Sequence, residues 1–262
     1  MVKIGSKTIT HIYQGSNLIT DDSSNTKDIK LGNKPVNFVY QGNELLYPNP
    51  VKDGLVLWYD FKGMKNSDMT KGVAKDLSGN GNDGELKNFI YTSESGYNNG
   101  LKFDGVDDFI GFEAKSRYLY KVEDDNKKHT ISFCLKAKED KRNNIAYSAE
   151  DLKIDVHGSS VRRTDNPFKI NVSYPMLNNI VHVDMVYDGV NHYTFLDGVL
   201  KDTQNIKISE QNINYTGISS VGAYIKSARA NMEFYFIKIY TRALTEEEIQ
   251  HNYQLEKERW GL

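Results

Sequence analysis

Cysteine is almost absent from this sequence. Cys134 is the single cysteine in 262 residues, so the chain cannot build an internal disulfide framework. No Cys/His spacing typical of a zinc site occurs either. Cys134 is therefore expected to be a thiol of the hydrophobic core.

Long runs of one residue type are also missing. No segment approaches the roughly 18 apolar residues of a membrane span, and residues 1–20 alternate polar and apolar where a signal peptide would have an apolar centre. The net charge is -2, the pI is about 6.3, and no cluster of Lys or Arg could follow a phosphate backbone. We therefore expect no signal peptide, no membrane insertion and no nucleic-acid partner.

The residues that are abundant favour β-structure. Hydrophobic residues make up 39% of the chain, and 17 Tyr and 11 Phe supply side chains that suit a pleated, half-buried surface. This composition argues against disorder. A length of 262 residues accommodates one large sandwich and a small accessory unit.

The first 50 residues contain an internal repeat. Residues 3–19 align without gaps on residues 30–46, and both copies contain Tyr-Gln-Gly. Each copy is typical of short strands separated by glycine turns, with Gly5 and Gly15 in the first copy. Such short strands bury too little surface to be stable alone. We expect residues 1–50 to be an assembly or anchoring segment; the alternative is a β-extension packed on the following domain.

Residues 51–262 show short strands punctuated by turns, a pattern typical of a sandwich. Residues 130–137 alternate with Ile131, Phe133, Leu135 and Ala137 on one face. Asp-Gly pairs at 188–189 and 197–198 predict hairpins with primed turns. The remaining predicted strands are residues 55–61, 101–105, 108–112, 181–187, 192–196 and 232–240.

A helix is predicted after the last strand. Thr245 and Glu248 have the spacing of a capping box, in which each side chain satisfies a free backbone amide of the other residue. The helix should extend to about Lys257.

Three parts of the sequence carry a resemblance to a known superfamily. The opening segments, the central hairpin and the ending resemble, in order, those of concanavalin A-like lectin/glucanase (laminin-G-like) domains. The tail and the Tyr-Gln-Gly repeats resemble parts of bacteriophage tail, baseplate or fibre proteins. The segments are residues 55–61, 76–84, 100–110, 187–198 and 239–249 for the first resemblance, and residues 251–261 with the N-terminal repeat for the second.

The resemblance implies an all-β fold, a concanavalin A-like jelly-roll β-sandwich over residues 51–262, with a small N-terminal β-repeat and a short C-terminal helix. It also implies a possible calcium site, because Asp76 and Asp104 match positions that lie near calcium in many members of the family. One expected acid of the closing strand is replaced by Tyr235. The alternative is that Asp76, Asn80 and Asn82 shape turns through local hydrogen bonds.

Catalysis is not favoured by the sequence. The Glu-x-Asp-x-x-Glu run that places two glycosidase carboxylates on one strand face is absent. The acidic cluster of residues 150–155 is interpreted as solvated surface, and His182 and His192 as satisfied structural histidines. We expect no catalytic residues and no cofactor other than calcium.

The two functional hypotheses follow from the resemblance. In one, residues 1–50 bind other virion proteins, and the sandwich of a homo-oligomer binds host cell-surface polysaccharide. In the other, the sandwich is a purely structural or decorating virion module; a glycan hydrolase is a third possibility. The glycan-binding hypothesis and the structural hypothesis both place the protein in the virion. The binding-site residues are left open among several tyrosines, including Tyr91, Tyr97, Tyr118, Tyr120 and Tyr224.

Overall fold

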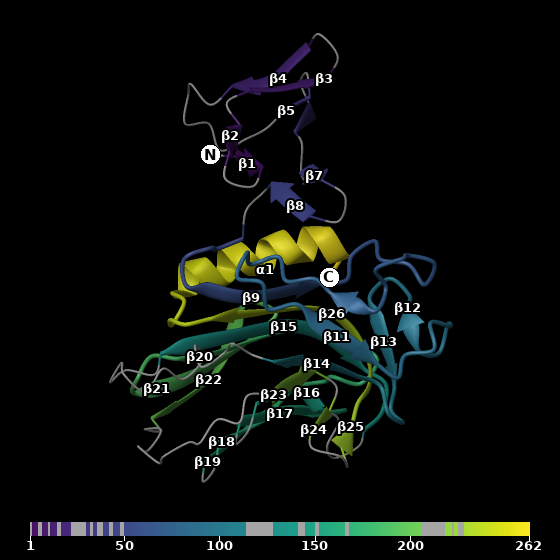
Figure 1. The fold of residues 1–262 in the computed structure, drawn as a ribbon. Coiled ribbons are helices and arrows are strands. Elements are labelled where there is room, and N and C mark those ends of the chain that lie inside the picture. Colours follow the sequence, from purple (N-terminus) through teal and green to yellow (C-terminus); the bar gives the residue numbers. More distant parts are fainter. Residues whose placement is uncertain are drawn as a thin grey trace.

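The computed structural model describes residues 50–113, 128–140, 145–149, 152–165, 168–205, 218–221, 223–224 and 228–262, together with the backbone of short strands within residues 1–49. The predicted fold class is confirmed. The chain is all-β, with two antiparallel sheets forming a sandwich and one helix at the C-terminus (Figure 1).

The N-terminal repeat is visible in its backbone pairing. Each copy forms two short antiparallel hairpins. The ladder shifts between Ile12 and Tyr13 in the first copy, and between Val39 and Tyr40 at the equivalent place in the second. The turn residues Gly5 and Gly15 and most of the spacer between the copies lie outside the described residues. The strands are β1 (Val2–Ile4), β2 (Lys7–Ile9), β3 (His11–Gln14), β4 (Asn17–Asp21), β5 (Lys30–Leu31), β6 (Lys34–Pro35), β7 (Val39–Gln41) and β8 (Glu44–Tyr47).

Two sheets make up the sandwich. The first has the order β10-β11-β14-β23-β16-β17-β18-β19, and the second has the order β12-β13-β26-β15-β20-β21-β22, with β9 also paired to β26. The first sheet comprises β10 (Val73–Ala74), β11 (Gly84–Lys87), β14 (Phe109–Glu113), β23 (Ile218–Val221), β16 (Ile145–Ala149), β17 (Leu152–His157), β18 (Ser160–Asp165) and β19 (Phe168–Ser173). The second comprises β9 (Leu55–Asp60), β12 (Gly96–Tyr97), β13 (Leu101–Asp104), β15 (His129–Ala137), β20 (Ile180–Tyr187), β21 (Asn191–Leu196), β22 (Val199–Asn205) and β26 (Asn231–Tyr240). A separate hairpin joins β24 (Ala223–Tyr224) to β25 (Ala228–Arg229).

Strand β26 changes partner along one of its edges. Its first residues pair with β13, from Asn231 opposite Asp104 to Phe234 opposite Leu101. Beyond Tyr235 the same edge pairs with β9, beginning with Phe236 opposite Asp60. The sheet therefore forks at Tyr235, and the chain leaves β9 at the fork.

The main core lies between the two sheets. The predicted inward face of β15 is confirmed, since Ile131, Phe133 and Leu135 are fully buried in this core. They meet residues of the first sheet such as Ile110 and Ile154. Burying each of these side chains contributes about 1.5–3 kcal/mol to folding.

The two Asp-Gly turns differ from each other. Asp197 and Gly198 both have positive φ, as the predicted primed turn requires. At the other turn only Gly189 has positive φ. The loop between β20 and β21 is one residue longer than the loop at Asp197, and the Asp188 carboxylate stabilises it by accepting hydrogen bonds from the amides of Val190 and Asn191.

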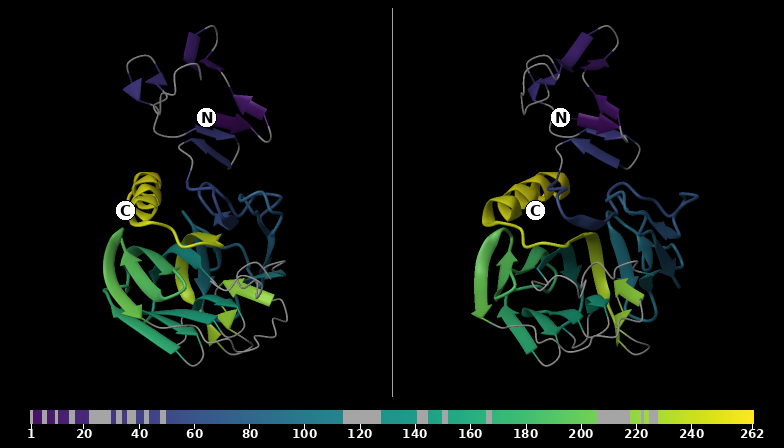
Figure 2. Two further views of the ribbon diagram at one scale, coloured as in Figure 1. Left: turned by 90° about the vertical axis from the view of Figure 1, so that its left-hand side faces the viewer. Right: turned by 60° about the vertical axis from the view of Figure 1, so that its left-hand side comes forward.

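Helix α1 (Glu246–Trp260) covers the outer face of the second sheet (Figures 1 and 2). The predicted capping box of Thr245 and Glu248 is present. The helix runs three residues beyond the predicted end because Gly261, in the left-handed conformation, terminates it. In the described part of the chain, no helix is long and apolar enough to span a membrane.

The contact between α1 and the sheet is unusually polar. Lys238 of β26 forms an ion pair with Glu256 of the helix, and Glu256 also accepts from Arg259 at 2.8 Å. Arg259 reaches Asp60 at the end of β9. All four side chains are buried, and apolar contacts from Ile249 and others complete the interface.

Candidate functional site

Asp76, one of the two predicted calcium ligands, lies in the loop between β10 and β11. Its Oδ1 accepts hydrogen bonds from the amides of Trp58 and Ser78 at 3.0 and 2.9 Å. Its Oδ2 accepts from the Ser78 hydroxyl and the Asn82 amide at 2.8 and 2.9 Å. Four donors therefore surround this buried carboxylate and fix the loop against β9.

The two asparagines of this loop have a related role. Asn80 and Asn82 donate their side-chain amides to the carbonyls of Leu55 and Val56 at 3.0 and 2.8 Å. These contacts hold the loop beside β9, together with the Ser78 hydroxyl, which also donates to the Val56 carbonyl at 3.1 Å. The hydrogen bonds of Asp76 to Ser78 and Asn82 are local, as in the alternative interpretation, whereas the asparagine side chains bond to a strand about 25 residues earlier in the chain.

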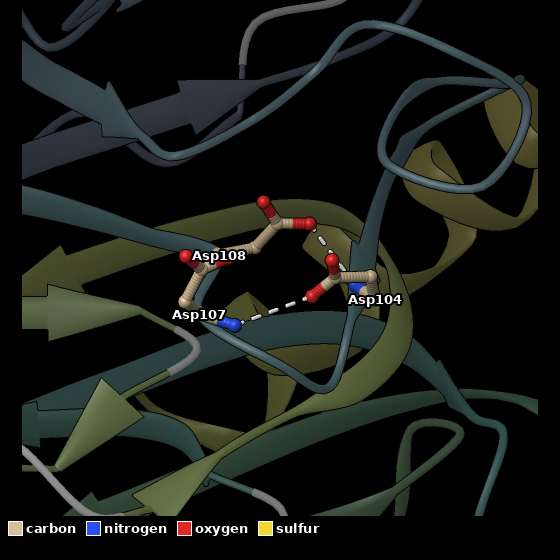
Figure 3. A group of neighbouring side chains, drawn as sticks. All are labelled: Asp104, Asp107 and Asp108. Atoms are coloured by element: carbon tan, nitrogen blue, oxygen red, sulfur yellow. Dashed lines mark hydrogen bonds between the residues drawn. The ribbon is translucent and has the colours of Figure 1, made fainter.

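Asp104, the second predicted ligand, belongs to an acidic turn between β13 and β14. The carboxylate oxygens of Asp104, Asp107 and Asp108 lie within 4.8 Å of one another (Figure 3). Asp76 is not part of this group. The Asp104 Oδ1 accepts from the amides of Val106 and Asp107 at 2.7 and 3.4 Å, and Gly105 turns the chain with a φ of 81°.

The three carboxylates differ in their environment. Asp108 is fully buried; its oxygens accept from the Ser95 hydroxyl and the Asp104 amide, both at 3.0 Å. Burial raises the pKa of Asp108 to about 6, although these hydrogen bonds act in the opposite direction. Asp107 is exposed. Hard oxygen donors of this kind suit Ca²⁺, with Asp107 and the Asp104 Oδ2 as the oxygens directed away from the turn's own amides. Calcium binding stays a prediction.

Tyr235 does not take the place of a ligand at this turn. It is buried beside Trp260 of α1 and donates its hydroxyl to Glu233 at 3.1 Å. The residue of β26 opposite Asp104 is Asn231. Asn231 donates its amide to Glu139 at 2.8 Å, so it is oriented by another acid.

A tyrosine-bearing loop lies beside the acidic turn. Tyr91 has a φ of 56°, which is rare for an aromatic residue, and its ring stacks on Tyr97 with centroids 6.4 Å apart. Asn66 fixes the loop by accepting from the Tyr97 amide at 2.7 Å. The ammonium of Lys71 lies 4.7 Å from the centre of the half-exposed Tyr91 ring. The Asn88 side chain donates to the carbonyl of Asp107 at 3.0 Å, which ties this loop to the acidic turn.

A pocket of about 590 Å³ opens where the chain leaves β9. Its walls include the apolar side chains of Phe61, Met64, Val73 and Leu77. Gly72, next to Val73, lies so close to the Tyr91 hydroxyl that a Cβ there would be 3.5 Å from it. The pocket and the Tyr91 loop are therefore neighbours.

The polar groups of the pocket are mostly engaged with protein partners. Asp60 pairs with Arg259 and Asp76 with the four donors described above. At the rim, Lys75 and Asp83 form a partly exposed pair at 2.7 Å. Partial burial would raise the pKa of Asp83, but the hydrogen bond from Lys75 prevails and lowers it. Among the lining residues, Asp83 is thus the one acid with an accessible carboxylate.

His182 lies beneath helix α1 with a serine and an aspartate nearby. The Ser132 hydroxyl is 2.9 Å from His182 Nε2, and an Asp184 oxygen is 3.4 Å from the same nitrogen. A catalytic triad needs the acid on the opposite ring nitrogen, and all three residues are fully buried. The arrangement therefore lacks the geometry and the access of a nucleophilic site. Cys134 is also buried in this region, as predicted, and burial raises its pKa.

Two sequence-based interpretations are corrected. His192 is not satisfied by hydrogen bonds: within the part of the chain that the structure describes, neither ring nitrogen has a hydrogen-bond partner, and the ring stacks on Tyr187 with centroids 4.4 Å apart. Asp155 is not solvated surface but fully buried, because basic side chains of β17 and β18 cover it. The neighbouring acids Glu150 and Asp151 lie outside the described residues.

The tyrosines considered for sugar binding are now partly placed. Tyr91 is half-exposed, whereas Tyr97 is buried with its hydroxyl donating to the carbonyl of Lys71 at 2.8 Å. Tyr118, Tyr120 and the side chain of Tyr224 lie outside the described residues. The pocket itself was not predicted, because its walls come from segments far apart in the sequence, such as residues 60–64 and 73–79, that only the fold brings together.

Comparison with known proteins identifies solved structures of similar fold but no match at the level of sequence families. No family model and no curated protein matches the sequence. The receptor-binding domain of botulinum neurotoxin C/D mosaic serotype superimposes with a TM-score of 0.58 at 16% identity, covering 78% of this chain and 52% of that one. Trypanosoma rangeli sialidase in complex with sialic acid gives 0.59 at 15% identity, covering 84% and 36%. The likeness is one of fold. This chain spans about half of the toxin domain and about a third of the sialidase.

Proposed function

We propose that this protein is a bacteriophage virion component whose sandwich binds host cell-surface polysaccharide without cleaving it. The pocket at the end of β9 is the observation that carries the proposal. Its volume of about 590 Å³ lies in the range of small-ligand sites, and its apolar walls with a few polar rim groups suit a sugar ring. Tyr91 beside it offers an aromatic surface.

The acids of the pocket support binding over hydrolysis. Glycoside hydrolysis generally needs two carboxylates that both reach the scissile bond. Asp60 and Asp76 are committed to Arg259 and to backbone amides, which leaves Asp83. The structural neighbours, one a receptor-binding domain and one a sialidase bound to sialic acid, are compatible with a glycan ligand.

The N-terminal repeat has its own place in the proposal. Residues 1–50 would bind other virion proteins, and a homo-oligomer would present several sandwiches together. Weak contacts with sugars then become firm attachment through avidity. The sequence resemblance to phage tail, baseplate and fibre proteins supports this part.

Sedimentation of the full-length chain with purified bacterial cell walls tests the binding function. We expect saturable binding that Thr70→Trp weakens at least tenfold, because the indole would fill the pocket. Met69→Trp is the matched control, since the adjacent Met69 side chain is fully exposed and does not line the pocket. Tyr91→Asn removes the ring but keeps a residue that tolerates positive φ, and it should also weaken binding.

Three results would contradict the proposal in different ways. Absence of wild-type binding to any wall preparation would favour a purely structural virion module. Equal binding by Thr70→Trp and Met69→Trp would remove the pocket from the site. Release of soluble sugars by the wild-type chain would show a hydrolase.

A further inference from the structure

The outer face of strands β17, β18 and β19 has a distinct character. These strands form one end of the first sheet, and residues such as Ile154 and Val161 point into the core. The alternate residues therefore face away from the second sheet. Helix α1 covers the other sheet.

A buried carboxylate organises this outer face. Asp155 lies directly opposite Arg162 in the ladder, and its side chain is completely buried although it points outward. Arg162 Nε and Nη2 donate to one oxygen of Asp155 at 3.2 and 3.0 Å. His157 Nε2 lies 2.7 Å from the other oxygen, and Lys153 Nζ 3.5 Å from the carboxylate.

The contact with Asp155 fixes the orientation of Arg162. A guanidinium is planar and has five N–H groups, so a fork held through Nε and Nη2 directs Nη1 away from the carboxylate. The Arg162 side chain keeps 26% of its surface exposed. The face thus presents an oriented cationic donor that has already lost its conformational freedom.

Two exposed side chains of β19 extend the donor array. Asn171 lies opposite Arg162 in the ladder, and Lys169 lies opposite Thr164, one outward position along the strand. Neighbouring outward residues on paired strands are within reach of a common ligand. Among the described side chains of this face, Lys153, Arg162 and Lys169 set three positive charges against the single negative charge of Asp155.

We propose that Arg162, Lys169 and Asn171 form a subsite for an anionic group, a carboxylate or a phosphate, carried by an acidic polysaccharide. The inference rests on the proposed function in that the ligand is a polysaccharide. It adds the charge of the ligand and a second contact surface on the sandwich. Asp155 acts as a positioning residue: it holds the Arg162 fork, and the anion meets the remaining N–H groups.

The experiment measures binding of the full-length chain to polygalacturonate, to polyglycerol phosphate and to carboxyl-reduced polygalacturonate, which is neutral. We expect the wild type to bind at least one acidic polymer more tightly than the neutral polymer, with an affinity that falls as salt rises. Arg162→Ala and Lys169→Ala should each lower that affinity at least fivefold. Lys169 is exposed, so its variant reports on the site even where the loss of Arg162 impairs folding.

Lys87→Ala is the matched control. Lys87 lies on β11 of the same sheet, is partly exposed and pairs with Glu85, so its removal changes the net charge equally. Unchanged affinity in this control is expected. An equal loss in Lys87→Ala and Lys169→Ala would overturn the subsite, because the effect would then be one of general charge.

The outcomes separate this inference from the proposed function. Binding of cell walls or of neutral polymer with no preference for the acidic polymers would overturn the anionic subsite alone. Failure to bind any wall preparation or polymer would overturn both.

Discussion

The guanidinium of Arg259, in the last turn of helix α1, lies 2.6 Å from the carboxylate of Asp60 at the end of β9. Neither side chain is more than 2% exposed. Arg259 also donates to Glu256, which pairs with Lys238 of β26. The C-terminal helix is thereby joined to two strands through charges that are removed from water, so each charge depends on its partners.

Replacing Arg259 with leucine should destabilise the fold strongly. The carboxylate of Asp60 would remain buried without its partner, at a cost of about 3–5 kcal/mol in the free energy of unfolding. Arg242→Leu is the comparison, because its partners Asp53 and Glu248 are partly exposed and its loss should cost about 1 kcal/mol or less. Urea denaturation measures both, and equal losses would contradict the prediction.

His192 should make the protein sensitive to acid. Burial, together with the nearby charges of Arg163 and His129, lowers the pKa of His192 to about 2. The folded state therefore keeps the ring neutral while the unfolded chain takes up a proton below about pH 6.5. The contribution of His192 to the free energy of unfolding is therefore fully present above about pH 6.5. It is lost as the pH falls from 6.5 toward 2, at about 1.4 kcal/mol per pH unit.

The variant His192→Phe tests this dependence. The free energy of unfolding of variant and wild type is measured in urea at pH 7.5 and at pH 5. The difference between the two proteins should shift by about 2 kcal/mol in favour of the variant when the pH is lowered from 7.5 to 5. Phenylalanine preserves the stacking on Tyr187 and removes two unpartnered nitrogens. A difference between wild type and variant that does not change with pH would show that His192 is protonated in the fold.

Calcium should stabilise the acidic turn through Asp107. Addition of calcium is expected to raise Tm, and Asp107→Asn should abolish the rise without changing Tm in chelator, because Asp107 is exposed. Protonation of Asp108 would remove a negative charge beside these ligands, so the effect should shrink at pH 5, below the pKa of Asp108 of about 6. Identical melting with calcium and with chelator would instead mean that the turn is held by its own hydrogen bonds.

Thr245→Ala should weaken the start of α1. The threonine hydroxyl accepts from the Glu248 amide at 3.3 Å, and the Glu248 carboxylate accepts from the Thr245 amide at 2.9 Å. Loss of such a cap costs about 1 kcal/mol. Thr245→Ser keeps the hydroxyl and should be nearly neutral in the same unfolding experiment.

Much of the sandwich was predictable because its strands alternate cleanly. Residues 130–137 and 232–240 were each placed within one residue of β15 and β26. The region from β16 to β19 was not predicted as strands. Apolar and polar residues alternate from Leu152 to His157 and from Phe168 to Ser173, but residues 150–155 were interpreted as an acidic surface cluster, so this signal was not used. In β18 the alternation is broken because Arg163 occupies an inward, buried position.

The site was less predictable than the fold. Asp104 was found through its motif, and Asp107 and Asp108 follow it directly in the chain. The pairing of Asp155 with Arg162 depends on the register of β17 and β18, which the turn between them determines. The pocket depends on where the chain leaves β9, and no local pattern encodes that point.

The fork at Tyr235 has a consequence for how such a protein can diversify. The pocket lies where two strands separate from a shared neighbour, and loops rather than the ladder supply most of its lining. Insertions and substitutions in residues 62–72 and 78–83 can therefore alter the pocket without disturbing the pairing of β26. One scaffold can in this way carry pockets of different shape by exchanging a few surface segments.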